Sequence, residues 1–206
     1  MTKLARAWVT ALALATGLTV GILSVADAKA DTATAIFAGG CFWCVEADFD
    51  KVDGVVGTVS GYTGGTLDNP TYEAVSHEDT GHYEAVEISY DPAKVNYAAL
   101  VAYFFRHVDP VDAGGQFCDR GPSYRTAIFV RDDAQRRAAE DAKAEAARIL
   151  GHTIATPILT ADTFYPAEGY HQDYYEKNPL KYKYYRWRCG RDARVEELWG
   201  EARTPS

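Results

Sequence analysis

Residues 39–44 read Gly-Gly-Cys-Phe-Trp-Cys and join two regular elements through a tight turn. The small apolar residues 33–38 before the turn predict a strand, and apolar residues at helical intervals over 41–50 predict a helix after it. Cys41 then falls at the N-cap or in the first turn of that helix. Because free backbone N–H groups and the helix dipole stabilise an anion there, we expect the pKa of Cys41 to be near or below neutral, which makes its sulfur a nucleophilic thiolate.

The same patterns continue along the chain and indicate the fold class. Alternating residues predict further strands at 55–62, 83–90, 124–130 and around Ile158. Helical periodicity predicts helices at 96–108 and 132–150. We expect an α+β fold, a two-layer α/β sandwich with a ferredoxin-like core, in which helices cover one face of a mixed sheet.

The C-terminal tail from 166 to 199 differs from the rest of the chain in composition. It is rich in tyrosine and contains Trp187 and Trp199. We expect a long irregular backbone there, with its aromatic rings packed over the core, because folded proteins bury most of such large apolar groups. No linker rich in Pro, Gly and Ser interrupts the chain, so residues 31–206 are interpreted as a single domain.

The composition excludes several classes of protein. At 206 residues and 22.6 kDa the chain can bury a substantial core, and its 47% of hydrophobic residues argues against disorder. The formal charge of −8 and the pI near 5.1 give no attraction for phosphate backbones or anionic lipid. We therefore expect no nucleic-acid partner.

Residues 1–30 have the pattern of a bacterial signal peptide. Lys3 and Arg6 form a positive start, residues 7–26 carry no charge, and small residues precede a cleavage position after Ala30. We expect a periplasmic or secreted protein with no stable membrane association after cleavage. An uncleaved membrane anchor is the alternative, since the apolar run is long enough to span a bilayer.

The four cysteines, Cys41, Cys44, Cys118 and Cys189, allow several interpretations. The first two match half of a zinc site, but the others are single and the five histidines show no paired helical spacing, so no metal is expected. Two structural disulfides are a second interpretation for an exported protein. A thioredoxin-like dithiol is the third, because a Cys-x-x-Cys pair that opens a helix after a strand has that chemistry.

Several further motifs resemble one enzyme family. They are Gly-Cys-Phe-Trp-Cys at 40–44, Gly-Tyr-Thr-Gly-Gly at 61–65, Asn-Pro-Thr-Tyr at 69–72, Gly-His-Tyr-Glu-Ala-Val at 81–86, Asp-Arg-Gly at 119–121 with Ser-Tyr-Arg at 123–125, and His-Gln-Asp-Tyr at 171–174 before Lys-Asn-Pro at 177–179. Together they resemble the A-type peptide methionine sulfoxide reductases, and the likeness extends from about residue 35 to Trp199. Position 44 departs from the commoner family pattern, which has glycine there.

The resemblance implies the reduction of methionine-S-sulfoxide, free or in proteins, to methionine. Cys41 falls on the family's nucleophile, which attacks the sulfoxide sulfur. Glu84 falls on the family's acid, and a carboxyl beside an apolar pocket has the raised pKa that lets it protonate the sulfoxide oxygen. The reaction leaves Cys41 as a sulfenic acid.

Five more residues match the substrate pocket of the family. Tyr72 and Tyr124 match phenols that donate hydrogen bonds to the sulfoxide oxygen. Phe42 and Trp43 match the ring pair that holds the terminal methyl group of the substrate. Asp119 matches a supporting carboxylate, and no bound cofactor is implied.

Recycling of the sulfenic acid requires a second cysteine and an external reductant. Cys189 is favoured as the resolving cysteine because family members often keep one in the tail, and Cys118 and Cys44 are the alternatives. A thioredoxin-like dithiol then reduces the disulfide, and we expect the enzyme to be monomeric. Two other functions stay open: a periplasmic Cys-x-x-Cys thiol-disulfide oxidoreductase, and a non-enzymatic binding module held by disulfides.

Overall fold

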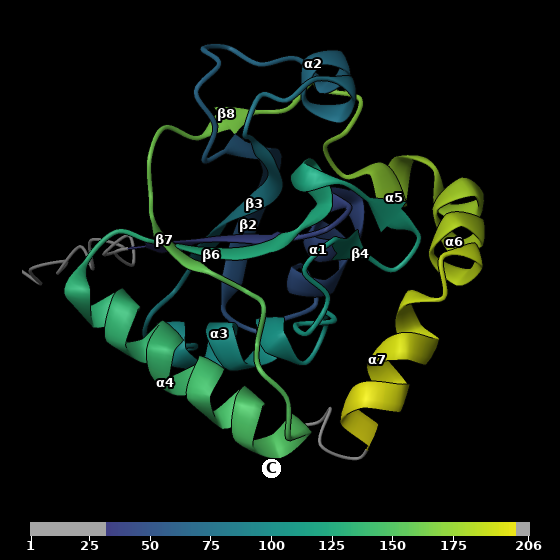
Figure 1. Cartoon of the computed structure of the whole chain (residues 1–206). Coiled ribbons are helices and arrows are strands. Elements are labelled where there is room, and N and C mark those ends of the chain that lie inside the picture. Colours follow the sequence, from purple (N-terminus) through teal and green to yellow (C-terminus); the bar gives the residue numbers. More distant parts are fainter. Residues whose placement is uncertain (1–31, 201–206) are drawn as a thin grey trace, which may run out of the picture.

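A six-stranded mixed sheet forms the centre of the structure, a computed structural model that describes residues 32–200 (Figure 1). The strands of this sheet are β1 (Ala33–Gly39), β2 (Val55–Thr63), β3 (Tyr83–Tyr90), β6 (Thr126–Val130), β7 (Ile158–Thr160) and β8 (Tyr165–Pro166). Their spatial order is β7-β6-β1-β3-β2-β8, in which β6 and β7 are parallel and the other neighbours antiparallel. Two short strands, β4 (Gly115–Gln116) and β5 (Asp119–Arg120), pair with each other.

Three helices cover one face of the sheet: α1 (Phe42–Phe49), α3 (Tyr97–Phe105) and α4 (Asp133–Leu150). They share an apolar core with the side chains on that face; the Phe37 ring of β1 stacks 5.0 Å from the Phe104 ring of α3. Ile36 and Ala38 alternate with Phe37 and belong to a second apolar cluster, against which Phe164 packs. The predicted α+β class, with a mixed sheet and helices on one face, is confirmed.

The caps that mark helix ends in the sequence explain where the helices begin and stop. The side-chain oxygens of Asn96 and Asp132 accept hydrogen bonds from backbone N–H groups in the first turns of α3 and α4. The nitrogen–oxygen distance is 2.8 Å in each. Helix α4 ends at Gly151, which has a left-handed φ of 65°. The sequence predicted neither α2 (Tyr72–His77) nor the 3₁₀ turn at Pro122–Tyr124, and both carry residues of the site described below.

The C-terminal tail is helical, so the expectation of an irregular backbone was wrong. It contains α5 (Tyr174–Lys177), α6 (Pro179–Arg188) and α7 (Arg191–Trp199). Pro179 lies in the first turn of α6, where backbone N–H groups have no partner within the helix, so its lack of an N–H costs no hydrogen bond. Gly190 has a left-handed φ of 66°, which permits the turn into α7. Because aromatic residues lie on both faces of α6, the sequence shows no amphipathic pattern from which this helix could be predicted.

The aromatic side chains of the tail are divided between the interior and the surface. Tyr182 and Trp199 are buried, as expected. Tyr184 and Trp187 are exposed, which contradicts the expectation that the rings all pack over the core.

Two expectations concern a part of the chain that the structure does not describe. The signal peptide at 1–30 and its alternative, a membrane anchor, both lie outside residues 32–200. Within 32–200, none of the helices has both the length and the apolar character that a membrane span needs.

Candidate active site

The Gly39-Gly40 turn carries β1 into α1 and sets the position of Cys41. Gly40 has a left-handed φ of 79°, and a Cβ at this position would lie 2.5 Å from the Cβ of Gln116, so glycine is required. Cys41 is the N-cap residue of α1, as predicted, and its side chain makes no capping hydrogen bond. The Cys41 sulfur is therefore not engaged in capping α1.

A pocket of about 60 Å³ lies next to Cys41. Sites for drug-sized ligands and cofactors have roughly 300 Å³ or more, so this pocket suits the end of a side chain. The structure brings together here every residue that the resemblance assigned to catalysis or substrate binding, and it adds Tyr185. The lining consists of Cys41, Phe42, Trp43, Tyr72, Glu84, Asp119, Tyr124 and Tyr185.

Glu84, on β3, is the buried acid of the pocket. It is 2% exposed, and one carboxyl oxygen accepts a hydrogen bond of 3.0 Å from the backbone N–H of Phe42. Burial raises the pKa of Glu84 to about 8, which outweighs the opposite effect of the Phe42 N–H, and the nearby Asp119 adds to the rise. Glu84 therefore holds a proton at neutral pH, in the direction that the sequence predicted.

Phe42 and Trp43 form the apolar wall of the pocket. Phe42 is buried, and its ring centroid lies 6.4 Å from that of Trp43. The Trp43 ring stacks on Tyr174 at 3.7 Å, and its indole N–H donates to Nδ1 of His171 at 3.0 Å. Both the face and the edge of Trp43 are thus held, by two residues that the sequence analysis did not assign to the site.

Three phenols line the pocket. Tyr72, at the start of α2, and Tyr124, in the 3₁₀ turn, hydrogen-bond to each other, and burial raises the pKa of both, so their O–H groups stay protonated. Tyr185 of α6 is the third; its O–H donates to the Asp119 carboxylate, and its ring packs against the buried cluster that contains Cys41. Sequence reasoning missed Tyr185, because nothing separates it from the other tyrosines of the tail.

Cys41 and Cys44 are free thiols joined by a hydrogen bond. Burial raises the pKa of Cys41 well above its ordinary value, and Cys44 and Glu84 raise it further. The hydrogen bond from Cys41 lowers the pKa of Cys44, and the positive charges of Arg191 and Arg186 act in the same direction. The direction predicted for the pKa of Cys41 is therefore contradicted: burial, Cys44 and Glu84 all raise it, and Cys44 is the more acidic partner.

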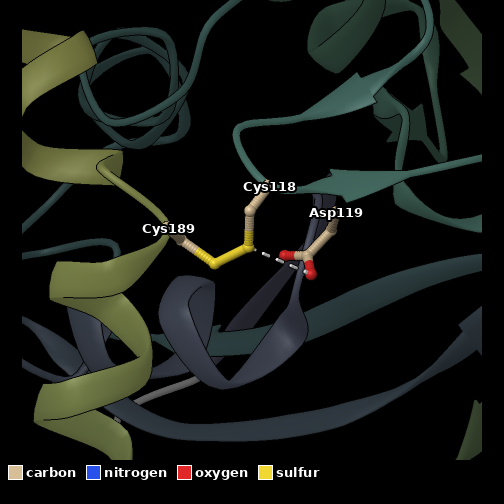
Figure 2. Close-up of side chains that lie close together, drawn as sticks. All are labelled: Cys118, Asp119 and Cys189. Carbon is tan, nitrogen blue, oxygen red and sulfur yellow. Dashed lines mark hydrogen bonds between the residues drawn. A yellow bond between two sulfur atoms is a disulfide. The ribbon is translucent and has the colours of Figure 1, made fainter.

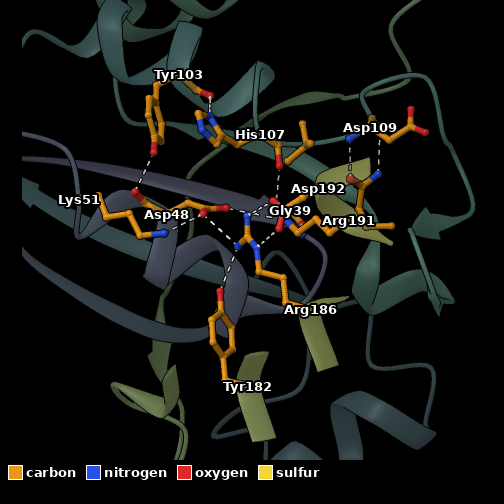
Figure 3. A network of polar contacts seen from close by, with 12 residues as sticks. Gly39, Asp48, Lys51, Tyr103, His107, Asp109, Tyr182, Arg186, Arg191 and Asp192 are labelled. Atoms are coloured by element: carbon orange, nitrogen blue, oxygen red, sulfur yellow. Dashed lines mark hydrogen bonds and ion pairs between the residues drawn. The ribbon is translucent and has the colours of Figure 1, made fainter. Parts of the chain in front are cut away.

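The arginines that act on Cys44 belong to a buried ion network (Figure 3). Asp48 of α1 pairs with Arg186 at 3.0 Å and with Arg191 at 3.8 Å. The Arg191 guanidinium also donates to two backbone carbonyl oxygens, and Arg186 reaches the surface carboxylate of Asp192 at 2.7 Å. Inside the protein, two guanidinium groups thus face one carboxylate, which leaves positive charge to stabilise a Cys44 thiolate.

Cys118 and Cys189 form a disulfide, with their Cα atoms 4.8 Å apart (Figure 2). Cys189 is the C-cap of α6, and the Cys118 sulfur lies 3.7 Å from a carboxylate oxygen of Asp119. Within residues 32–200 these three side chains form a group with ligand atoms within 4.8 Å of one another, but the two sulfurs are bonded to each other and offer no thiolate. The interpretation of two structural disulfides was wrong, since Cys41 and Cys44 are free.

An α+β fold that sets a free cysteine and a protonated carboxyl on one small pocket, with a second free cysteine buried behind the first, defines a thiol-dependent oxidoreductase. Comparison with known proteins identifies its family. The family model for peptide methionine sulfoxide reductase matches residues 33–203. Over 182 residues the chain is 56% identical to peptide methionine sulfoxide reductase MsrA 2 of Caulobacter vibrioides, which covers 88% of this chain and 92% of that protein.

Solved structures agree with the family model. Mxr1 from Saccharomyces cerevisiae in reduced form has a TM-score of 0.69 at 33% identity, and the match covers 72% of this chain and 86% of that one. Mxr1 in complex with Trx2 has a TM-score of 0.51 at 25% identity, over 74% and 91% of the two chains. The chain belongs to the peptide methionine sulfoxide reductase family, and the resemblance drawn from its motifs is confirmed.

The proton distribution over the cysteine pair can be measured by thiolate absorbance near 240 nm. Because the Cys118–Cys189 disulfide does not titrate, we expect the wild type to form one thiolate below the ordinary cysteine value of 9.0. In Cys44→Ser the absorbance should rise only at more alkaline pH, since burial still raises the pKa of Cys41. An acidic thiolate that persists in Cys44→Ser would show that Cys41 is the acidic thiol after all.

Proposed function

We propose that the chain reduces methionine-S-sulfoxide, free and in proteins, in the pocket beside Cys41. The observation that carries this assignment is the placement of Cys41 and the protonated Glu84 on one small pocket with an aromatic wall. The reaction needs a nucleophile on the sulfoxide sulfur and an acid on its oxygen, and these two groups supply both. Reduction of half of a racemic sulfoxide, with the other epimer left intact, is the direct test.

The chemical step moves one proton to the substrate oxygen and one electron pair between two sulfurs. The Cys41 sulfur forms a bond to the sulfoxide sulfur while its own proton passes to Cys44 in its thiolate form. Glu84 protonates the oxygen, which then bonds to the Cys41 sulfur. The bonds of the substrate sulfur to oxygen and to Cys41 break, which leaves methionine and a sulfenic acid. The substrate sulfur is reduced by two electrons, and the Cys41 sulfur is oxidised by two.

The remaining pocket residues orient the sulfoxide for this step. The phenols of Tyr72 and Tyr124 donate hydrogen bonds to the oxygen, which strengthen as negative charge develops there. The rings of Phe42 and Trp43 enclose the methyl group. Asp119 acts through Tyr185, whose O–H it fixes by hydrogen bonding beside Cys41.

Cys44 is the first partner of the sulfenic acid in our proposal, because it is the cysteine that hydrogen-bonds with Cys41. Its thiol condenses with the Cys41 sulfenic acid to a disulfide and releases water. This revises the preference for Cys189 as the resolving cysteine. Cys189 instead works with Cys118 as a second pair, whose two thiols reduce the Cys41–Cys44 disulfide and become a disulfide themselves.

An external dithiol protein of the thioredoxin type then reduces the Cys118–Cys189 disulfide. Two observations support this partner. Cys118 is exposed, so a protein thiolate can reach the bond. The related Mxr1 has been solved in complex with Trx2. No bound cofactor enters this sequence of steps, and we propose that the enzyme works as a monomer.

The ferredoxin-like description of the core is also a proposal. Strands β1, β2, β3 and β6, taken in chain order as first to fourth, lie side by side in the order fourth, first, third, second. Helix α1 connects the first two, α3 lies between the last two, and all three neighbouring pairs are antiparallel. This arrangement is that of a split βαβ motif.

Export is proposed from the leader at 1–30 and places the mature enzyme in a bacterial periplasm. Expression in a bacterial host should give a periplasmic product whose N-terminus is Asp31. A full-length product retained in the membrane fraction would support the anchor in its place. The periplasm is oxidising, so recycling there would depend on a dedicated dithiol donor.

The role of Glu84 predicts both a rate and a pH profile. Glu84→Gln should slow single-turnover reduction by pre-reduced enzyme by about 10² to 10⁴-fold, since an amide has no acid proton to give. In the wild type the rate should fall as pH rises through about 8, where Glu84 loses its proton. Quenched-flow release of methionine measures both.

Glu87→Gln is the matched control for Glu84→Gln. Glu87 lies on the same strand, but it pairs with Arg131 at the surface, so the rate should stay at the wild-type value. An unchanged rate in Glu84→Gln would exclude Glu84 as the acid.

The two cysteine pairs predict the size of the burst before any reductant is added. Fully reduced wild type should release about two methionines per enzyme, and Cys189→Ser about one, because each cysteine pair stores one disulfide. In Cys44→Ser the Cys41 sulfenic acid should persist long enough to be trapped by dimedone. A Cys41–Cys189 disulfide as the first product of the wild type, mapped by mass spectrometry, would return the resolving role to Cys189.

A further inference from the structure

Helix α6 has an apolar face that the rest of residues 32–200 leaves mostly exposed. Leu180 is 82% exposed, Tyr184 63% and Trp187 73%, and the spacing of four and then three residues puts them on one side of the helix. The Tyr184 and Trp187 rings lie 6.0 Å apart. The opposite side of α6 is covered, since Tyr182 is buried beside Cys44 and Tyr185 lines the active-site pocket.

The concentration of apolar side chains on this one helix is unusual for the described surface. Elsewhere in residues 32–200 the exposed large hydrophobic residues are Val56, Leu67 and Tyr170, which come from separate segments. Scattered residues of this kind are ordinary, whereas a continuous patch marks an interaction site. Trp and Tyr are also the side chains that most often dominate protein–protein interfaces.

The charged residues of helix α6 itself are all positive. Helix α6 contains two lysines and two arginines and no acidic residue, although the chain as a whole has a formal charge of −8. Lys181, Lys183 and Arg188 are exposed beside the aromatic residues. A basic helix on an acidic protein favours a partner with an acidic surface, since charge complementarity selects the partner and speeds its approach.

The apolar face ends next to the disulfide that must be reduced. Cys189 follows the last residue of α6, and Figure 1 shows α6 at the periphery of the molecule, outside α5 and above α7. A groove of about 290 Å³ runs along this turn and is lined by Lys183, Trp187 and Gly190, among others. A protein that brings a thiolate to Cys118–Cys189 therefore comes to lie beside α6.

We propose that the face formed by Leu180, Tyr184 and Trp187, with Lys183 beside it, is the docking surface for an acidic dithiol protein that reduces the Cys118–Cys189 disulfide. This inference rests on the proposed recycling function. The partner's first thiolate attacks one sulfur of the pair, which breaks the S–S bond and forms a mixed disulfide. Its second thiol then releases the enzyme, so the partner leaves as a disulfide and Cys118 and Cys189 each gain a hydrogen.

The test compares a protein reductant with a small one. Steady-state reduction of a methionine sulfoxide ester is measured with bacterial thioredoxin, its reductase and NADPH, and separately with dithiothreitol. Trp187→Ser and the double variant Leu180→Ser/Trp187→Ser should raise the KM for thioredoxin by about tenfold or more, with the dithiothreitol rate unchanged. Lys183→Glu should also raise this KM and weaken its dependence on salt.

Val56→Ser is the matched control, because Val56 is 58% exposed on β2 and should leave both rates at the wild-type value. An unchanged KM for thioredoxin in the α6 variants overturns the docking surface while recycling stands. A wild type that dithiothreitol reduces and thioredoxin does not would instead contradict the recycling function itself.

Two other occupants of the α6 face give different results, and each overturns the proposal. If the face binds oxidised protein substrates, the variants raise the KM for oxidised protein under dithiothreitol and leave the KM for thioredoxin unchanged. If it binds a second copy of the chain, the wild type sediments as a dimer and the variants as monomers.

Discussion

The hydrogen bond from the Phe42 N–H to Glu84 fixes the geometry on which the chemistry depends. It joins the first residue of α1 to β3, far apart in sequence, at a donor–acceptor distance of 3.0 Å. Cys41 precedes Phe42 and Trp43 follows it, so the nucleophile, the aromatic wall and the acid are positioned by one contact. It also satisfies a helix N-terminal N–H that would otherwise lack an intrahelical partner. A protonated Glu84 keeps an oxygen lone pair for this bond and still has its O–H to give to a substrate.

Burial has opposite consequences for the reactivity of the acid, Glu84, and of the nucleophile, Cys41. Removal from water favours the neutral form of both Glu84 and Cys41, which helps an acid but hinders a nucleophile that must become an anion. The acidity of Cys44 offsets this disadvantage for the nucleophile. The pKa of Cys44 is lowered by the hydrogen bond from Cys41 and by two guanidinium groups, so Cys44 gives up its proton more readily than the attacking sulfur does.

The residues of the pocket were found in the sequence by two routes. The Gly-Gly turn before a predicted helix identified Cys41 from the residues alone, whereas Glu84 and the two phenols were assigned only by the resemblance of their motifs to the family. The thiol chemistry was predicted less well. The pKa of Cys41 depends on how much protein covers it, and the acidity of Cys44 depends on Arg186 and Arg191, more than 140 residues away in sequence; neither quantity can be read from residues 39–44.

The tail was predicted least well because one of its helices, α6, has aromatic residues on two faces. Burial on a single side is the signal by which a helix is found in a sequence, and α6 has aromatic residues on both sides. Its inner side supplies Tyr182 and Tyr185 to the cysteines and the pocket, and its outer side presents Tyr184 and Trp187. A helix that met only the core would need no rings on its outer side, so the feature that concealed α6 in the sequence is the same feature that argues for a partner.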